Sequence, residues 1–204
     1  MKTVRSVVLL MVCGLTLCGR AWAADADASK HSAQEIAAKP ELIVTAIQGQ
    51  TAENAAAIVA QALTAIFSSD LTDAKKRENV IALIAYAVAT MGPEAAPMMG
   101  LVAAGAPPSW LPVIAATAVV AAGNDSPAVA QAMLDAVAGN AELVEACRAA
   151  CANPSTVLSQ AEMAIILGIA LQTPAQTTVK APPLPTNLRR AQTHIRSAVK
   201  YSGQ

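Results

Sequence analysis

Apolar residues recur at helical spacing along the central part of the chain. In residues 51–67, TAENAAAIVAQALTAIF, the apolar positions lie three or four residues apart: Ala55, Ile58, Val59, Ala62, Leu63 and Ile66. That spacing places them on one face of an α-helix, with Glu53, Gln61 and Thr64 elsewhere on the wheel. No stretch of the chain alternates between apolar and polar residues as a half-buried strand does. The pattern predicts an all-α fold.

Two further signals place helices in this pattern. Residues 79–91, NVIALIAYAVATM, are apolar on all sides, which predicts a central buried helix. Ser32 with Glu35, and Ser159 with Glu162, have the spacing of a capping box, in which each side chain bonds a backbone amide of the other residue. We therefore expect helices to begin after Ser32 and after Ser159.

Proline and glycine divide the remaining apolar sequence. The breaks stand at Gly92-Pro93, Ala106-Pro107-Pro108, Ser126-Pro127 and Gly139-Asn140, and we expect Ser126 to cap the helix that follows it. Gly100 is interpreted as a helix stop or a close-packing position. Between Glu94 and Asp125 no residue is charged, a length that could span a bilayer, but Pro107 and Pro108 divide it. We interpret the two pieces as buried helices of a bundle.

These breaks predict seven or eight helices in antiparallel hairpins. Three segments, 40–49, 93–105 and 127–139, each resemble the first helix of a hairpin, but their residues superimpose poorly. Two architectures therefore stay open: an irregular antiparallel bundle, or a short α-solenoid of helical hairpins. Alanine, with 48 copies, favours helices that approach closely and bury little area per residue.

The first residues predict export. Lys2 and Arg5 precede an apolar run that ends in Ala21-Trp22-Ala23, the pattern of a cleaved signal peptide. We expect residues 1–23 to be removed by cleavage before Ala24, which makes the mature protein periplasmic or extracellular. Residues 24–173 then form an alanine-rich helical domain.

Residues 174–204 differ in kind from that domain. A Pro- and Thr-rich linker is followed by NLRRAQTHIRSAVKY, in which Leu188, Ala191, Ile195 and Ala198 or Val199 form a narrow apolar stripe. All 14 acidic residues lie in 24–173, against 6 lysines and arginines, a charge of −8. The C-terminal segment carries no acid and five bases, a charge of +5: Lys180, Arg189, Arg190, Arg196 and Lys200. It could dock on the acidic domain, stay disordered, or bind an anionic surface or acidic partner.

Cys147 and Cys151 are the two cysteines that remain after the expected cleavage. They share a predicted helix face, and three interpretations stay open: a disulfide, a pair of buried thiols, or a metal or redox site. Export favours the disulfide, whereas residues four apart on a helix have Cβ atoms about 5–6 Å apart and a disulfide requires about 3.8 Å. No C-x-x-C spacing or ligand cluster supports the third.

The chain contains no recognisable catalytic constellation, cofactor motif or metal-ligand cluster, so we expect no enzyme, no cofactor and no metal site. Trp110, between prolines, closes the end of the core or serves as an aromatic anchor at an interface. The residues that we predict to take part in interactions are therefore Trp110, Arg189, Arg190, Arg196 and Lys200.

The sequence thus favours an exported, non-enzymatic helical interaction or scaffold protein that binds a protein partner or itself. The alternative is a peripheral envelope-surface protein, in weak contact with an anionic membrane or polyanion through the basic segment. An enzyme of unfamiliar type would need acids from different helices to converge. Nucleic acid is not expected as a partner of an exported protein.

Overall fold

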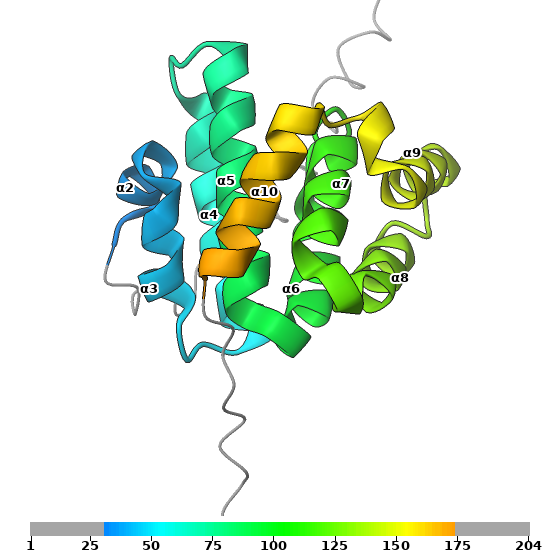
Figure 1. The fold of residues 1–204 in the computed structure, drawn as a ribbon, viewed down its shortest axis with the longest axis horizontal. Helices are drawn as coiled ribbons and strands as arrows, with labels where there is room; N and C mark the ends of the chain where they lie inside the picture. Colours follow the sequence, from blue (N-terminus) through cyan, green and yellow to red (C-terminus); the bar gives the residue numbers. More distant parts are fainter. Residues whose placement is uncertain (1–30, 174–204) are drawn as a thin grey trace, which may run out of the picture.

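The computed structural model describes residues 31–173, in which every regular element is helical (Figure 1). The α-helices are α2 (Ala33–Ala38), α3 (Ile43–Ile47), α4 (Ala52–Ser68), α5 (Asp73–Met91), α6 (Ala95–Gly105), α7 (Leu111–Ala122), α8 (Ser126–Ala136), α9 (Ala141–Ala152) and α10 (Gln160–Gln172). Short 3-10 turns join them: η2 (Pro40–Leu42), η3 (Gly92–Glu94), η4 (Gly123–Asp125) and η5 (Pro154–Thr156). The predicted all-α fold is confirmed. The expected signal peptide, its cleavage site and the segment 174–204 lie outside the described residues.

Both predicted capping boxes are present. At the start of α2, the Ser32 amide donates to Glu35 at 2.8 Å and the Glu35 amide donates back to the Ser32 hydroxyl at 3.2 Å. Ser159 and Glu162 repeat this exchange at the start of α10, with 2.7 and 3.2 Å. Local sequence is sufficient to place these two helix starts because both partners lie within four residues.

The predicted cap at Ser126 was wrong. Ser126 is the first residue of α8, its backbone is helical, and its amide donates to the Gly123 carbonyl. The reason is η4, which runs directly into α8, so that Ser126 never has the extended backbone that an N-cap requires. Gly92 ends α5 as predicted, and Gly123 ends α7 in the same way: their φ angles of 54° and 55° fall in the region that glycine alone adopts readily.

The helices pack in two rows, and α10 packs over α5 and α7 (Figure 1). Helices α2, α4, α6 and α8 form the first row, and α3, α5, α7 and α9 form the second. Successive helices of a row contact one another more extensively than the two members of hairpins α6–α7 and α8–α9 do. Helix α10 contacts both α5 and α7. The hairpins exist in the chain, but the packing runs along the rows.

The core lies between the rows and under α10. All six apolar positions predicted to form the inner face of α4 are buried, and α5 is buried almost throughout from Asn79 to Met91. The amide of buried Asn79 donates to the Ala37 carbonyl at 2.9 Å, which satisfies an acceptor in the last turn of α2. That bond fixes the first helix of one row to the central helix of the other.

Helices α6 and α8 approach very closely at Gly100. A Cβ atom built on Gly100 would lie 3.1 Å from the backbone oxygen of Ala132, closer than ordinary van der Waals contact. Of the two roles that its sequence context allowed, Gly100 is therefore a close-packing position and not a helix stop.

Two stretches of the described chain, Asp73–Gly105 and Leu111–Ala136, are long and apolar enough to cross a membrane by length and composition alone. Each consists of two helices joined by a 3-10 turn. Of the apolar windows in these stretches, 61% and 44% respectively are buried inside the bundle. Packing in the core therefore accounts for much of their apolar character, and the stretches alone do not establish a membrane span.

Replacing Thr117 with valine should raise the free energy of unfolding by about 1 kcal/mol. Thr117 lies fully buried on α7, and its hydroxyl has no hydrogen-bond partner within residues 31–173. Valine keeps the shape and removes an unsatisfied polar group. Thr90→Val is the matched control. The buried Thr90 hydroxyl donates to the Tyr86 carbonyl at 2.7 Å, so its loss should lower the free energy of unfolding. Urea denaturation measures both, and a destabilised Thr117→Val would contradict the expectation.

Candidate functional site

Helix α10 exposes large apolar side chains to solvent. Ile165, Leu167 and Leu171 are 53, 50 and 88% exposed, whereas Leu71 and Leu101, the other exposed large apolar residues of the described chain, are each 38% exposed. Ala161 and Ala164 are exposed on the same helix, and Gly168 lies between these side chains with nothing within 4 Å of the Cβ position. These six residues, Ala161, Ala164, Ile165, Leu167, Gly168 and Leu171, are called the α10 outer face below.

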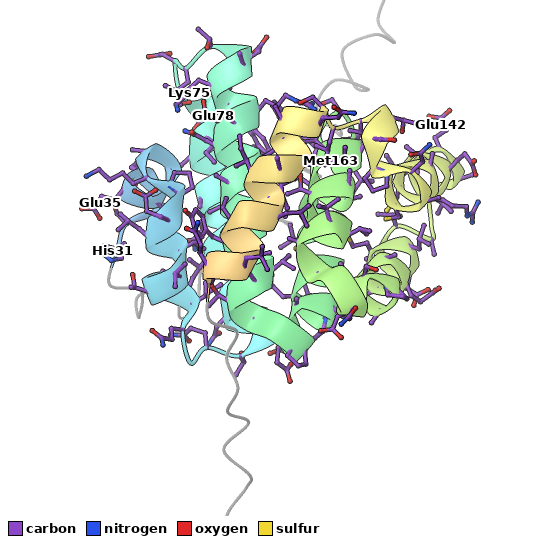
Figure 2. All side chains as sticks on the ribbon, viewed as in Figure 1. His31, Glu35, Lys75, Glu78, Glu142 and Met163 are labelled. Atoms are coloured by element: carbon purple, nitrogen blue, oxygen red, sulfur yellow. The ribbon has the colours of Figure 1, made fainter. Side chains whose placement is uncertain are left out.

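The opposite side of α10 faces the bundle. Ile166 is fully buried, and Met163 and Ile169 pack against the core (Figure 2 labels Met163). Because α10 is apolar on both sides, burial of one side leaves the other as an uncharged surface. Such a surface on an outer helix is typical of a site for contact with another apolar segment. The sequence contained the signal, since MAIILGIAL is apolar all round, but its position outside the rows was not predictable.

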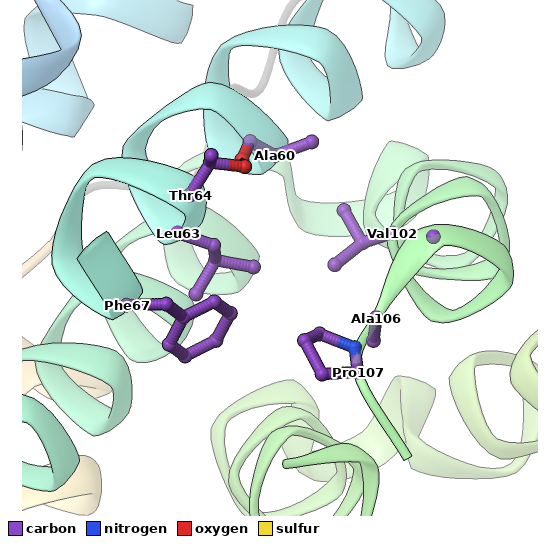
Figure 3. Close-up of a pocket in the computed structure, with 8 residues that line it drawn as sticks. Ala60, Leu63, Thr64, Phe67, Val102, Ala106 and Pro107 are labelled. Atoms are coloured by element: carbon purple, nitrogen blue, oxygen red, sulfur yellow. The ribbon is translucent and has the colours of Figure 1, made fainter. Parts of the chain in front are cut away.

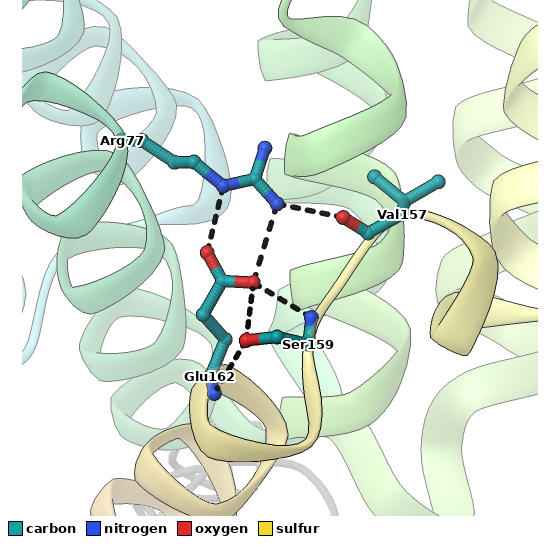
Figure 4. Close-up of polar contacts among 4 residues, drawn as sticks. All are labelled: Arg77, Val157, Ser159 and Glu162. Carbon is teal, nitrogen blue, oxygen red and sulfur yellow. Dashed lines mark hydrogen bonds and ion pairs between the residues drawn. The ribbon is translucent and has the colours of Figure 1, made fainter. Parts of the chain in front are cut away.

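An ion pair holds the start of α10 against α5 (Figure 4). Arg77 on α5 donates from Nε to Oε1 of Glu162 at 2.7 Å and from Nη2 to Oε2 at 3.3 Å. The same Nη2 donates to the Val157 carbonyl at 2.6 Å, just before α10 begins. Arg77 thus binds both the helix and the chain leading into it. No sequence pattern linked Arg77 to Glu162, because 85 residues separate them.

This network changes the acidity of Glu162. The hydrogen bond from Arg77 is the largest cause that lowers the pKa of Glu162, which falls to about 2, and the Ser159 amide and hydroxyl lower it further against a partial desolvation. Glu162 is therefore ionised throughout the neutral range. Its charge is engaged in docking α10, which is a structural role.

Cys147 and Cys151 lie together on α9 as free thiols, Cys147 buried and Cys151 half-buried. Donation of a hydrogen bond to Cys147 raises the pKa of the Cys151 thiol, and burial raises it further. A thiol held protonated is a poor nucleophile and a poor metal ligand. The disulfide stays a prediction, and a mass measurement with and without reductant tests it: an unchanged mass would rule it out.

Trp110 stands at the N-cap of α7, half-buried, with its ring 5.1 Å from that of Phe67 at 31°. This contact joins α7 to the end of α4 and closes that end of the core. Beside it, a small cavity of about 100 Å³ lies between α4 and α6 (Figure 3), lined by Ala60, Leu63, Thr64, Phe67, Val102, Gly105, Ala106 and Pro107. Its one polar side chain, Thr64, already donates to the Ala60 carbonyl at 2.9 Å. The cavity can hold a small apolar group but offers no chemistry.

Acidic side chains are dispersed over the surface. Glu35, Glu78 and Glu142 project from α2, α5 and α9 on separate parts of the molecule (Figure 2). Within residues 31–173, no three histidine, cysteine or acidic side chains gather as metal ligands would. The basic residues predicted to take part in interactions, Arg189, Arg190, Arg196 and Lys200, lie outside the described residues.

Comparisons with protein-family models, with curated proteins and with solved structures found no match to this chain. The physical properties of the α10 outer face are therefore the basis of the functional argument.

Proposed function

We propose that this protein is an exported, non-enzymatic helical scaffold, built as a short α-solenoid, that binds a protein partner or a second copy of itself through the α10 outer face. The exposure of Ile165, Leu167 and Leu171 carries the proposal. Burying such side chains against another apolar surface is favourable by about 1.5 kcal/mol or more for each fully covered residue. A solvent-exposed cluster of this kind is the usual mark of an interaction site.

Other features support a scaffold over an enzyme. The two-row packing resembles that of helical-repeat proteins, which present extended surfaces to partners. The charged side chains of the described chain are spread over separate helices or engaged in structural pairs, such as Arg77 with Glu162. The Cys151 thiol, whose pKa is raised, is held in the protonated form that disfavours nucleophilic chemistry.

The test compares the mature protein, residues 24–204, with the double variant Leu167→Gln/Leu171→Gln. We expect the mature protein to self-associate in light scattering or to retain a partner from envelope extract. The double variant should lose this association, because two glutamines oppose desolvation of the face. Leu71→Gln/Leu101→Gln is the matched control: the same change at exposed leucines of the bundle, which should leave association intact. A monodisperse monomer that retains nothing would contradict the proposal.

A further inference from the structure

We propose that the α10 outer face is covered in cis by residues 188–199 of the same chain, docked as an amphipathic helix that a partner must displace. The inference rests on the proposed function in that both concern this face. Its occupant is the protein's own C-terminal segment, and a partner competes with it. Four independent features of the chain lead to this occupant.

The first feature is the shape and polarity of the face. Its centre consists of Ala164 and Gly168, one helical turn apart, with Leu167 and Leu171 on one side and Ile165 on the other. A Cβ on Gly168 would meet nothing within 4 Å. Because small residues lie between larger ones, a narrow row of side chains from a second helix can pack closely against this part of α10. None of the outer-face residues is charged, so the occupant must present apolar side chains.

The second feature is the pattern of the segment itself. Leu188, Ala191, Ile195 and Val199 follow one another at intervals of three, four and four residues, a stripe about one side chain wide. Twelve residues of helix are marginal in water without a surface to pack on. The narrow apolar stripe of this segment and the uncharged α10 outer face would each be covered by the other.

The third feature is reach. The structure describes the chain as far as Thr173, directly after α10, and residues 174–187 are rich in proline. An extended linker of this length spans about 43 Å at about 3.1 Å per residue, whereas α10 is about 20 Å long. The linker can therefore return the segment to either end of α10. Tethering also gives the segment an effective concentration of about 1 mM, above that of an external partner.

The fourth feature is charge. The domain, residues 24–173, contains all 14 acidic residues against 6 bases, while the segment beyond it has five bases and no acid. Helix α10 ends without a basic residue in its last turn, and Asp125 borders the cavity that Ala170 and Thr173 line beside that end. Arg189, Arg196 and Lys200, which lie beside the stripe, would be attracted by the net negative charge of the domain and by the C-terminus of α10.

The same charges disfavour two other occupants. A second copy would bring two mature chains, each of net charge −3, together over few large apolar residues, where a stable interface needs about 1,200 Å² or more. Self-association through this face is therefore expected only where residues 188–199 have been displaced from it. An anionic membrane would repel the acidic domain, and α10 itself carries no lysine or arginine to anchor it to lipid headgroups.

Photo-crosslinking in the full mature chain tests the inference. Leu171, at 88% exposure, is replaced by p-benzoylphenylalanine, and the products are separated by size and mapped by mass spectrometry. We expect crosslinks to residues 188–199 within monomers. Ile195→Asp should reduce them about tenfold, because an unpaired carboxylate resists burial. Ser197→Asp, with the same charge on the opposite side of the stripe, should leave them nearly unchanged.

Three outcomes would overturn the inference. Crosslinks confined to dimers would assign the face to a second copy. Crosslinks absent or equally reduced by both aspartate variants would show that the stripe does not occupy it. Binding of anionic vesicles that shields Leu171 and is lost in high salt would assign the face to a membrane. None of these outcomes depends on whether a protein partner is found. The crosslinking experiment therefore tests docking of residues 188–199 even if the proposed function is wrong.

Discussion

Gly100→Val should lower the free energy of unfolding by about 3 kcal/mol, because the new side chain has no room between α6 and α8. Even a bare Cβ would stand 3.1 Å from the Ala132 oxygen, and that atom belongs to the backbone of a helix. A flexible side chain could rotate away, whereas a helical carbonyl moves only if α8 itself moves. Valine adds two methyl groups to this contact, so the two helices must separate and lose part of their buried interface.

Gly105→Val is the matched control for this change. It lies on the same helix, at the last residue of α6, and nothing lies within 4 Å of its Cβ position. This change should alter the free energy of unfolding by no more than about 0.5 kcal/mol. The difference in helix propensity between valine and glycine is small compared with the cost of a steric clash. Urea denaturation of both variants decides the matter. Equal stabilities for the two valine variants would show that α6 and α8 do not meet at Gly100.

Glu162→Gln should destabilise the protein by about 2 kcal/mol at pH 7, with an effect that disappears in acid. The folded-state pKa of Glu162 is lowered to about 2, below its ordinary value of 4.5. The charged form therefore contributes stability that is fully present above pH 4.5 and is lost as the pH falls through about 2. Solvent reaches 32% of the Arg77 side chain and 23% of that of Glu162, which weakens the pair below its fully buried strength.

The measurement is the difference in unfolding free energy between the two proteins from pH 7 down to pH 2. The stability curves should converge below pH 4.5, and glutamine should retain much of the capping contact with Ser159. Glu145→Gln is the control, because its pair with Arg148 is largely exposed and should contribute less than about 0.5 kcal/mol. A difference that persists unchanged at pH 2 would show that the charge of Glu162 is not the cause.

Loss of the ion pair should also loosen α10. Arg77 joins Glu162 and the Val157 carbonyl, so the network fixes both the first turn of α10 and the chain that enters it. Hydrogen exchange in residues 160–172 of Glu162→Gln would then rise above that of the rest of the bundle. This links a stability effect to the helix that carries the proposed interaction face.

Features that depend on neighbours within about four residues were predictable from the sequence. Both capping boxes, the glycine stop at Gly92 and the buried face of α4 lie where the pattern placed them. The prediction of a cap at Ser126 was wrong because the 3-10 turn η4 directly precedes this residue, and no residue pattern in the sequence indicated that turn. Short-range hydrogen bonds and helical periodicity are encoded in adjacent residues, so the all-α fold follows from them.

The rows, the Arg77–Glu162 pair and the exposure of the α10 outer face depend on residues far apart in the chain. Residues 79–91 and 163–171 are similarly apolar all round, yet α5 lies in the core and α10 lies on the outside. Their difference arises from what packs around each helix: α5 has neighbours on most sides, whereas α10 rests on α5 and α7 alone among its major contacts. The sequence by itself determined which residues form helices. Only the tertiary structure decided which apolar faces remain uncovered, because burial depends on neighbours that local spacing does not specify.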